Sequence, residues 1–224
     1  MGSRTNCQYQ RRTISTRIWL EGTEAPYKIV ATYRNNTISP FNFPQIIKKV
    51  GEKYNNAYVL VETNDIGGQV SNILYQDLNY ENLLMTRING RKGQVLSQGF
   101  AQGKSEMGLR TTAQTKKLGC AILKRLVEED KILLNDERII QELMSFVSKS
   151  NTYKAEDGQH DDLVMTLVFF AWLTRQEYYS DLIETSKLNY ENAQKPEDDN
   201  VLFMVNDKDD DEEFSDGAVV WYPV

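Results

Sequence analysis

The sequence predicts an α/β fold in which a mixed sheet is flanked by helices. Three observations lead to this class. β-branched and aromatic residues dominate two early stretches, Thr13–Leu20 and Tyr27–Tyr33. A short apolar run, Ala57–Val61, stands between two segments with helical spacing. Helical and strand-like patterns then alternate as far as Leu173, which is typical of helices packed on a sheet with both parallel and antiparallel pairs.

The first elements are expected to be a hairpin, a helix and a buried strand. Glu21–Pro26 contains glycine and proline and joins the two early strand-like stretches, as a hairpin turn does. Pro44 is typical of a helix start, and the apolar residues at positions 46, 47, 50 and 54 follow helical spacing. Ala57–Val61 is continuously apolar and ends at Glu62, which indicates a buried parallel strand.

The later elements are expected to be mainly helical. Asp65 is a candidate cap for a helix with apolar residues at positions 70, 73, 74 and 78, and Leu83–Thr86 is a strand candidate. Asn89–Thr111 is rich in glycine and basic side chains, so a loop or flexible hairpin is expected there. The remaining predicted elements are helices at Thr112–Glu129, Asp136–Phe146 and Leu163–Leu173, and a brief strand at Ile132–Leu134.

Length and composition exclude several classes of protein. A chain of 224 residues is one domain with an appendage or two very small domains, and 40% hydrophobic residues are enough for a core. No apolar run is long enough to span a bilayer, and the N-terminus has no secretory signal, so no membrane partner is expected. Cys7 and Cys120 are far apart in sequence, which favours a reduced intracellular protein. The predicted boundaries are an atypical N-terminal segment (1–12), a domain (13–180) and an acidic tail (181–224).

The net charge of −6 hides two parts of opposite sign. Residues 181–224 contain 13 acidic and 3 basic residues, so the remaining 180 residues carry a net charge of +4. Ten basic and four acidic residues fall between Arg87 and Lys131. Such a basic bias is typical of a protein that meets a polyanion, although a solvated surface would have the same composition. The acid run of the tail, Asp207–Glu213, is a solvated segment, a mimic of DNA or a contact for a partner. The apolar ends, Val201–Val205 and Val219–Val224, indicate docking on both sides of the acid run.

Three carboxylates stand in positions from which they could act. Glu62 follows a buried strand, at the edge where open α/β sheets place their ligands, and is either a solvated strand end or a site residue. Asp161 and Asp162 precede a strongly apolar helix, and one of them is expected to cap it. Because a cap needs only one carboxylate, the second could bind a divalent cation together with Glu62. His160 is either a loop residue without a role or a group that orients a metal or a phosphate.

Gly99–Ser105 has the appearance of a nucleotide-binding P-loop. That motif needs four residues between its two glycines and a buried strand before them, whereas three residues separate Gly99 from Gly103 and Val95–Leu96 is too short. We therefore reject nucleotide binding at this loop, and a contact between the basic loop and a phosphate backbone stays open.

Four stretches of the sequence, taken together, carry a resemblance to a known family. They are Asn36–Ser39, Val61–Gly67, Gln114–Cys120 and Glu156–Met165, the last of which contains His160-Asp161-Asp162. From about Thr13 to Arg175 the chain resembles the C-terminal nuclease domain of the large terminase subunit, the DNA-packaging motor of contractile-tailed phages. The resemblance implies an RNase H-like mixed sheet and an endonuclease that cuts concatemeric viral DNA in the host cytoplasm during packaging.

The resemblance also implies a site and partners. Mg²⁺ or Mn²⁺, as two ions, would be bound by Glu62 and by the pair Asp161 and Asp162, which would be the catalytic carboxylates. Which aspartate of the pair binds metal stays open, with Asp162 favoured. The implied partners are double-stranded DNA, the terminase ATPase domain, the portal and the small terminase subunit. The basic residues expected to contact DNA are Arg91, Lys92, Lys104, Arg110, Lys116 and Lys117.

The chain departs from the family at its N-terminus. The family carries a first metal-binding Asp on a strand before the hairpin, whereas this chain has no acidic residue before Glu21. The first strand is therefore expected to be absent or altered. The alternative function is a catalytically impaired terminase fragment that binds DNA or the packaging assembly without cleaving it.

Overall fold

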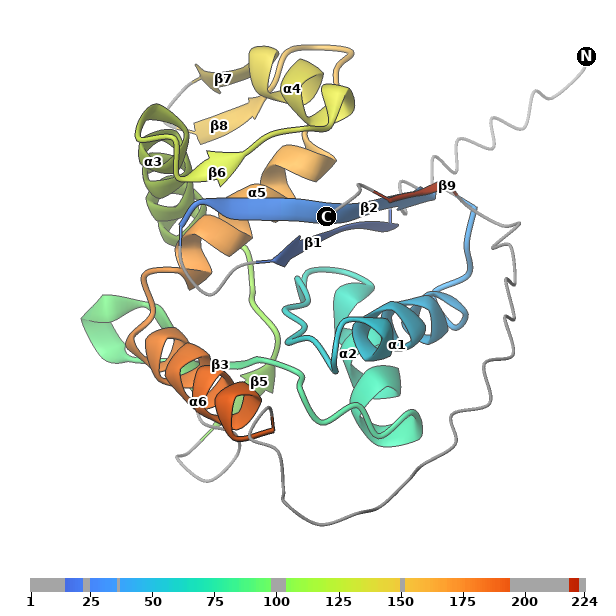
Figure 1. The fold of residues 1–224 in the computed structure, drawn as a ribbon. Coiled ribbons are helices and arrows are strands. Elements are labelled where there is room, and N and C mark those ends of the chain that lie inside the picture. The colour runs from blue at the N-terminus through green and yellow to red at the C-terminus, as the bar shows by residue number, and fades with distance from the viewer. Residues whose placement is uncertain are drawn as a thin grey trace, which may run out of the picture.

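The computed structural model describes residues 15–21, 25–35, 37–97, 104–149, 152–193 and 218–221 (Figure 1). The backbone alone is described for residues 15–21, 186–193 and 218–221 and for Arg91. The N-terminal segment 1–12, most of the Gly99–Ser105 loop and the acid run of the tail lie outside the described residues.

The predicted hairpin forms, and its second strand is the centre of the first sheet. Strands β1 (Ser15–Glu21) and β2 (Tyr27–Asn35) pair antiparallel, with a shift of register between Trp19 and Leu20. On its other edge β2 pairs in parallel with β6 (Ile132–Leu133) through Tyr27 and Lys28. The same edge pairs antiparallel with β9 (Ala218–Trp221) through Ala31–Arg34. The apolar end of the tail thus docks on the sheet.

The first helical layer covers one face of this sheet, below it in Figure 1. Helix α1 (Phe43–Lys53) has Pro44 in its first turn, as predicted. An extended segment leads from α1 to α2 (Gly67–Asn72), which continues directly into the π-helical turn η1 (Ile73–Asp77). Residues from α1, from residues 59–61 and from η1 form one core with Val30, Ala31 and Tyr33 of β2.

The apolar run at residues 57–61 is extended and parallel to its neighbours, but it is not a regular strand. It makes isolated parallel bridges, Val59 to Leu83 and Glu62 to Leu109. Val59 and Val61 are buried, whereas Tyr58 is 42% exposed. The predicted parallel direction is confirmed, whereas the predicted buried strand is reduced to isolated bridges, and Tyr58 on one side of the segment meets solvent.

The basic stretch predicted as a loop forms a second sheet. Strands β4 (Gln94–Ser97) and β5 (Ser105–Met107) both pair antiparallel with β3 (Met85–Ile88), and the 3₁₀ turn η2 (Gly90–Lys92) precedes β4. The alternative prediction of a flexible hairpin is nearer to the structure than a loop, because β4 lies in this stretch and forms a hairpin with β3. A short strand in the middle of this sheet is stabilised by partners on both edges.

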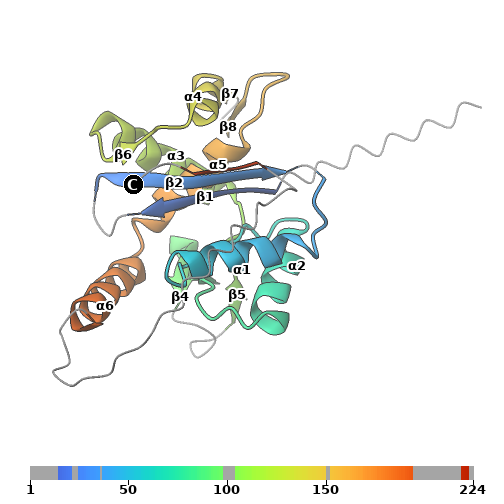
Figure 2. The same cartoon turned by 45° about the vertical axis from the view of Figure 1, so that its right-hand side comes forward.

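The second helical layer covers the opposite face of the first sheet, as the two views in Figures 1 and 2 agree. Helices α3 (Ala113–Glu128), α4 (Glu137–Met144) and α5 (Asp162–Leu173) pack there with Ile29 of β2. The three predicted helices are confirmed. The α3 and α5 axes approach closely at Gly119, where an added Cβ would lie 2.5 Å from the carbonyl oxygen of Val168.

Two remaining elements complete the fold. The hairpin of β7 (Phe146–Lys149) and β8 (Thr152–Ala155) precedes α5, and α6 (Glu177–Ala193) follows it. Helix α6 packs through Tyr178, Tyr179 and Leu182 on a third core that contains Trp172 and Leu96. This helix continues across residue 180, where the end of the domain was predicted. The division into domain and tail stays a prediction. Among the described residues, no helix is long and apolar enough to cross a membrane.

Candidate functional site

Glu62 lies at the end of the extended segment and is partly buried. Its Oε1 accepts a hydrogen bond from the Thr111 hydroxyl. Asn64 strengthens the same contact between the two loops, because its Oδ1 accepts from the Thr111 backbone N–H at 3.2 Å and its Nδ2 donates to the Thr111 carbonyl oxygen at 3.4 Å. Thr111 directly precedes Thr112, the cap of α3. The Glu62 carboxylate is thus fixed at the N-terminus of that helix.

The turn after Glu62 depends on glycine. A Cβ on Gly67 would lie 1.6 Å from the Glu62 carbonyl oxygen, so only glycine allows α2 to begin this close to the extended segment. Asp65 was predicted to cap α2, and this prediction is wrong. The N-cap position is Ile66, without a side-chain cap, and Asp65 has a positive φ of 52° in the turn.

Asp161 and Asp162 begin α5, but neither caps it. Asp161 occupies the N-cap position and makes no side-chain cap hydrogen bond. The carboxylate of Glu142, on α4, takes that role from another element, because its Oε2 accepts from the backbone N–H groups of Leu163 at 2.8 Å and Val164 at 3.2 Å. The predicted cap is therefore corrected. The two aspartate side chains are released from capping and point to other partners.

Those partners are mainly cationic. Arg34, near the end of β2, reaches Asp162 at 3.7 Å with Nη2 and Glu142 at 3.7 Å with Nη1. Lys116 of α3 lies 3.9 Å from Asp161 and also stands over the ring of Phe146. His160, half exposed, lies 3.9 Å from Asp162 through Nδ1. The aspartate pair therefore lies beside Arg34 of β2, Lys116 of α3 and His160 of the loop before α5.

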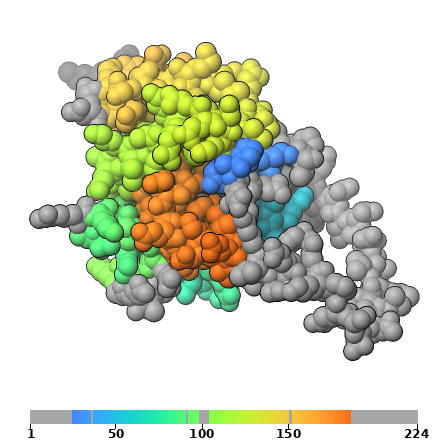
Figure 3. Space-filling model, turned by 60° about the vertical axis from the view of Figure 1, so that its left-hand side comes forward, coloured from blue at the N-terminus to red at the C-terminus, as the bar shows by residue number. Residues whose placement is uncertain are grey.

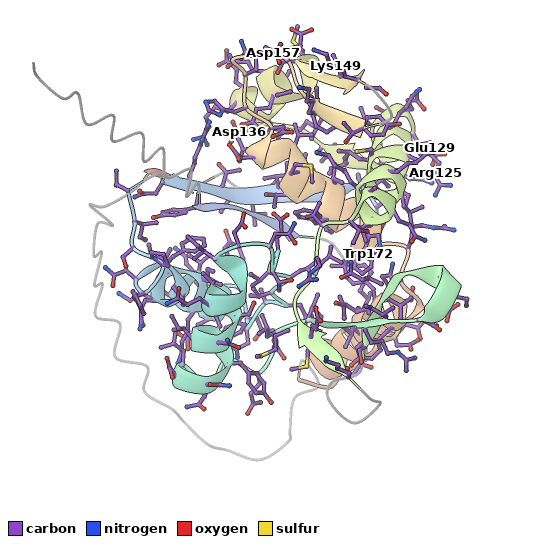
Figure 4. The ribbon with its side chains drawn as sticks, turned by 180° about the vertical axis from the view of Figure 1, so that it is seen from behind. Arg125, Glu129, Asp136, Lys149, Asp157 and Trp172 are labelled. Atoms are coloured by element: carbon purple, nitrogen blue, oxygen red, sulfur yellow. The ribbon has the colours of Figure 1, made fainter. Side chains whose placement is uncertain are left out.

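Helix α4 is held in register with β2 by a second acidic group. Asp136 caps α4, as predicted, by accepting from the Arg138 backbone N–H at 2.8 Å. Its other oxygen accepts from the Thr32 hydroxyl of β2 at 2.9 Å. Asp136 is buried, whereas Figure 4 shows Lys149 and Asp157 at the outer end of the molecule. The path from β2 through Asp136 and α4 to Glu142 fixes the start of α5.

Burial changes the titration of two groups near the aspartates. Burial raises the pKa of the Glu142 carboxyl, although the two α5 amides and Arg34 act in the opposite direction. Burial also raises the pKa of the Cys120 thiol to about 11; Lys116 opposes this rise and Asp161 adds to it. Cys120 is therefore a protonated packing residue at neutral pH and not a nucleophile.

The described residues do not complete a metal site. No three His, Cys, Asp or Glu side chains of the described part of the chain gather closely enough to hold a metal ion. Two of the expected ligands, Asp161 and Asp162, lie side by side at the start of α5, whereas Glu62 lies at the start of α3 with Thr111. The carboxylates present thus fit part of a ligand set for a hard divalent cation but not all of it.

The residues predicted to contact DNA differ in their surroundings. Lys92, Lys104, Arg110 and Lys117 are exposed, and the side chain of Arg91 lies outside the described residues. Lys116 instead turns toward Asp161. Gln94 joins two of the basic segments, since its amide both donates to the Arg110 carbonyl oxygen at 2.6 Å and accepts from the Arg110 N–H at 2.9 Å.

The family of the chain follows from comparison with known proteins. A family model described as the terminase RNase H-like domain matches residues 14–170. The chain belongs to this family. The match confirms the resemblance and the RNase H-like fold class, and it spans Glu62, Asp161 and Asp162. Residues 1–12, where the first strand was expected to be absent or altered, lie outside both the match and the described residues.

Solved structures of terminase nucleases are similar to this terminase RNase H-like domain. Two structures of the large terminase nuclease from thermophilic phage G20c, one with bound magnesium and one with bound cobalt, each have a TM-score of 0.47. They are 17% and 18% identical in sequence, and the alignments cover 75% of this chain and 84% of theirs.

Three residues of the site were missed by sequence reasoning. Thr111, Arg34 and Glu142 each act through contacts with residues far away in the sequence. Glu142 gave one signal that could have been noticed: it follows Ile139 by three positions, on the buried face of an amphipathic helix, where a carboxylate needs a partner.

Proposed function

We propose that the chain is the nuclease domain of a terminase large subunit and cuts concatemeric double-stranded viral DNA during genome packaging. The observation that carries the proposal is the match to the terminase RNase H-like domain across residues 14–170, which contains all three candidate carboxylates. Glu142 fixes the start of α5, where Asp161 and Asp162 lie, and the Thr111 hydroxyl donates to Glu62. Such supporting contacts are expected around side chains that take part in catalysis.

A divalent cation, Mg²⁺ or Mn²⁺, belongs to this proposal. Similar terminase nucleases are described with bound magnesium and with bound cobalt, which supports a requirement for a divalent ion. Glu62, Asp161 and Asp162 are the residues of this chain that we assign to metal binding. Because these three do not complete the site, two-ion catalysis would require a further carboxylate beyond the described residues or from another chain.

The DNA partner is supported by the charge of the chain. The basic excess between Arg87 and Lys131 falls on β3–β5 and α3, next to Thr111 and Glu62. Lys92, Lys104, Arg110 and Lys117 are exposed there and could pair with phosphates. The terminase ATPase domain, the portal and the small subunit are the further proposed partners, and the host cytoplasm is the proposed location.

A nicking assay tests the assignment. Supercoiled plasmid is incubated with the chain and Mn²⁺, and then with the variants Glu62→Gln and Asp162→Asn. Asp157→Asn is the matched control, because Asp157 lies in the loop that leads to Asp161 and Asp162. Its side chain is 84% exposed and lies at the outer end of the molecule (Figure 4). Nicking should disappear in the two site variants and persist in the control. Equal nicking by all four proteins would refute the assignment.

The second candidate is a domain that binds DNA without cutting it. It is favoured by the absence of any acidic residue before Glu21 and by the incomplete gathering of carboxylates in the described part of the chain. It predicts DNA binding that weakens with salt, and no nicking at any Mn²⁺ concentration. Nicking that depends on Glu62 would exclude it.

A further inference from the structure

We propose that a hollow beside the carboxylate site binds one nucleotide phosphate of a DNA strand. The hollow has a volume of about 390 Å³ and lies where β3 and β4, the middle of α3 and the α5–α6 junction meet. Figure 3 shows these green, lime and orange segments bordering one another on one face. A volume of this size is within the range of small-ligand sites and can hold a single nucleotide unit. The inference rests on the proposed function, because it adds a second contact between the nuclease domain and its substrate.

The cationic wall of the hollow carries the proposal. Arg87 of β3, Lys92 of η2 and Arg175 after α5 all line it. In the described part of the chain, none of the three lies within ion-pair distance of a carboxylate. The three positive charges are therefore available to an anion.

Arg87 has the donor geometry that suits a phosphate. Its Nε is buried and has no hydrogen-bond partner in the protein, so this atom is out of reach of a ligand in the hollow. A guanidinium offers further donors in a planar fork that matches the oxygens of a phosphate.

The rest of the lining agrees with a nucleotide rather than a bare ion. Trp172 forms a buried apolar wall, and Leu118 of α3 is 46% exposed beside it. Leu118 offers an exposed apolar surface for the sugar or base attached to the phosphate, and Trp172 supports the wall from within. Figure 4 shows Trp172 in the interior, away from the outer side of α3.

The position of the hollow relative to Glu62 indicates that the ligand belongs to the same DNA strand. Gln94 lines the hollow and exchanges two hydrogen bonds with the backbone of Arg110. The next residue, Thr111, donates to Glu62. A strand that passes Glu62 along the start of α3 would therefore reach the cationic wall.

Two acidic residues oppose the cations. Glu177 and Asp181, both on the first turns of α6, also line the hollow and would repel a phosphate. This opposition gives a test in which a variant gains affinity, which a misfolded protein cannot mimic. Asp181→Asn should tighten binding of the anion, whereas Arg87→Met and Arg175→Gln should weaken it.

The experiment measures binding of a short fluorescein-labelled oligothymidine by anisotropy, in EDTA, across a series of salt concentrations. Arg87→Met and Arg175→Gln should each weaken binding about tenfold and lower the salt slope by roughly 0.7, the contribution of one phosphate contact to a single strand. Arg125→Gln is the control, since Arg125 is a surface residue that pairs with Glu129 at the outer side of α3 (Figure 4). Folding is checked for every variant by urea denaturation.

The outcomes separate this inference from the proposed function. Lower slopes for the Arg87 and Arg175 variants, with tighter binding by Asp181→Asn, support the site. Slopes equal to that of the control overturn it and leave the nuclease proposal intact. If the parent chain does not bind the oligothymidine, the nicking assay with double-stranded DNA and Mn²⁺ still decides the nuclease proposal. The site is then tested by titration with thymidine monophosphate and with inorganic phosphate. Binding to the parent chain that is lost in Arg87→Met supports the site, and absence of binding to the parent chain overturns it.

Discussion

The start of α5 depends on one buried carboxylate from another helix. Glu142 is 7% exposed, accepts from two backbone N–H groups of α5 and has Arg34 beside its other oxygen. A carboxylate at a helix N-terminus also interacts favourably with the helix dipole. The arrangement leaves both aspartate side chains at the helix start available for other contacts.

Replacing Glu142 should therefore destabilise the protein more than an exposed change in the same helix. Glu142→Ala leaves two buried amides without an acceptor, and we expect a loss of roughly 2–3 kcal/mol in the free energy of unfolding. Glu142→Gln keeps an acceptor and should lose less. Glu137→Ala, at an exposed position of α4, should cost less than about 1 kcal/mol. Urea denaturation measures all three, and equal effects of the Glu142 and Glu137 changes would contradict the capping role.

At the scale of residues, the sequence predicted the carboxylates but not their supports. Glu62 and the aspartate pair were found because a strand end and a helix start are visible in local patterns. Glu142 and Arg34 were not found, because their roles depend on α4 and β2 meeting the start of α5 in space. The same lack of spatial information led to the wrong choice of Asp161 or Asp162 as the cap.

At the scale of elements, the turn between the extended segment and α2 decides where Glu62 points. This turn brings the helix back against the backbone it has just left. Gly67 makes that return possible, because the Glu62 carbonyl oxygen occupies the place of a side chain. The neighbouring Gly68 has no such contact, since the nearest atom to an added Cβ is 3.9 Å away.

The two glycines give a matched pair of variants. Gly67→Ala should destabilise the protein by about 1–3 kcal/mol or more, because the backbone must shift to relieve the overlap. Gly68→Ala should be neutral or slightly stabilising, because alanine favours a helix by up to about 1 kcal/mol over glycine. Thermal unfolding of both variants checks the prediction, and similar melting temperatures would contradict the described turn.

Helices were predicted better than strands. The helices α1, α3, α4 and α5 follow from local spacing of apolar residues, which their own sequences contain. The strands β4 and β5 lie in a glycine-rich basic stretch and gain their stability from pairing with β3, so no local pattern identified them. The β7–β8 hairpin, which precedes the aspartate pair, was missed for the same reason.

At the scale of the whole molecule, β2 organises the fold. It contributes to two cores, because Ile29 packs with α3 and α5 whereas Val30, Ala31 and Tyr33 pack with α1. Along one edge it pairs with β1, and along the other it pairs with β6 and then β9. The overall α/β class and the mixed pairing were predictable from the alternation of patterns, whereas the return of β9 was expected only as docking of an apolar end.

The pairing of β9 can be tested without removing the tail. Val220→Pro removes a backbone donor opposite Thr32 and should weaken this part of the sheet. Amides of Ala31–Arg34 that β9 protects should exchange with solvent faster, while the Tyr27 amide, which donates to the Lys131 carbonyl oxygen, should be unchanged. Hydrogen exchange measures both, with Val220→Thr as control. Unchanged exchange at Ala31–Arg34 would contradict the pairing.

The edge that β9 covers has a consequence during synthesis on the ribosome. β2 emerges before the strand that pairs with Ala31–Arg34, which follows only after the acid run of the tail. Until then this part of β2 offers unpaired backbone groups to other nascent chains. We therefore expect the growing polypeptide to aggregate more readily than the finished one, with the acidic segment keeping the late intermediate soluble by charge repulsion.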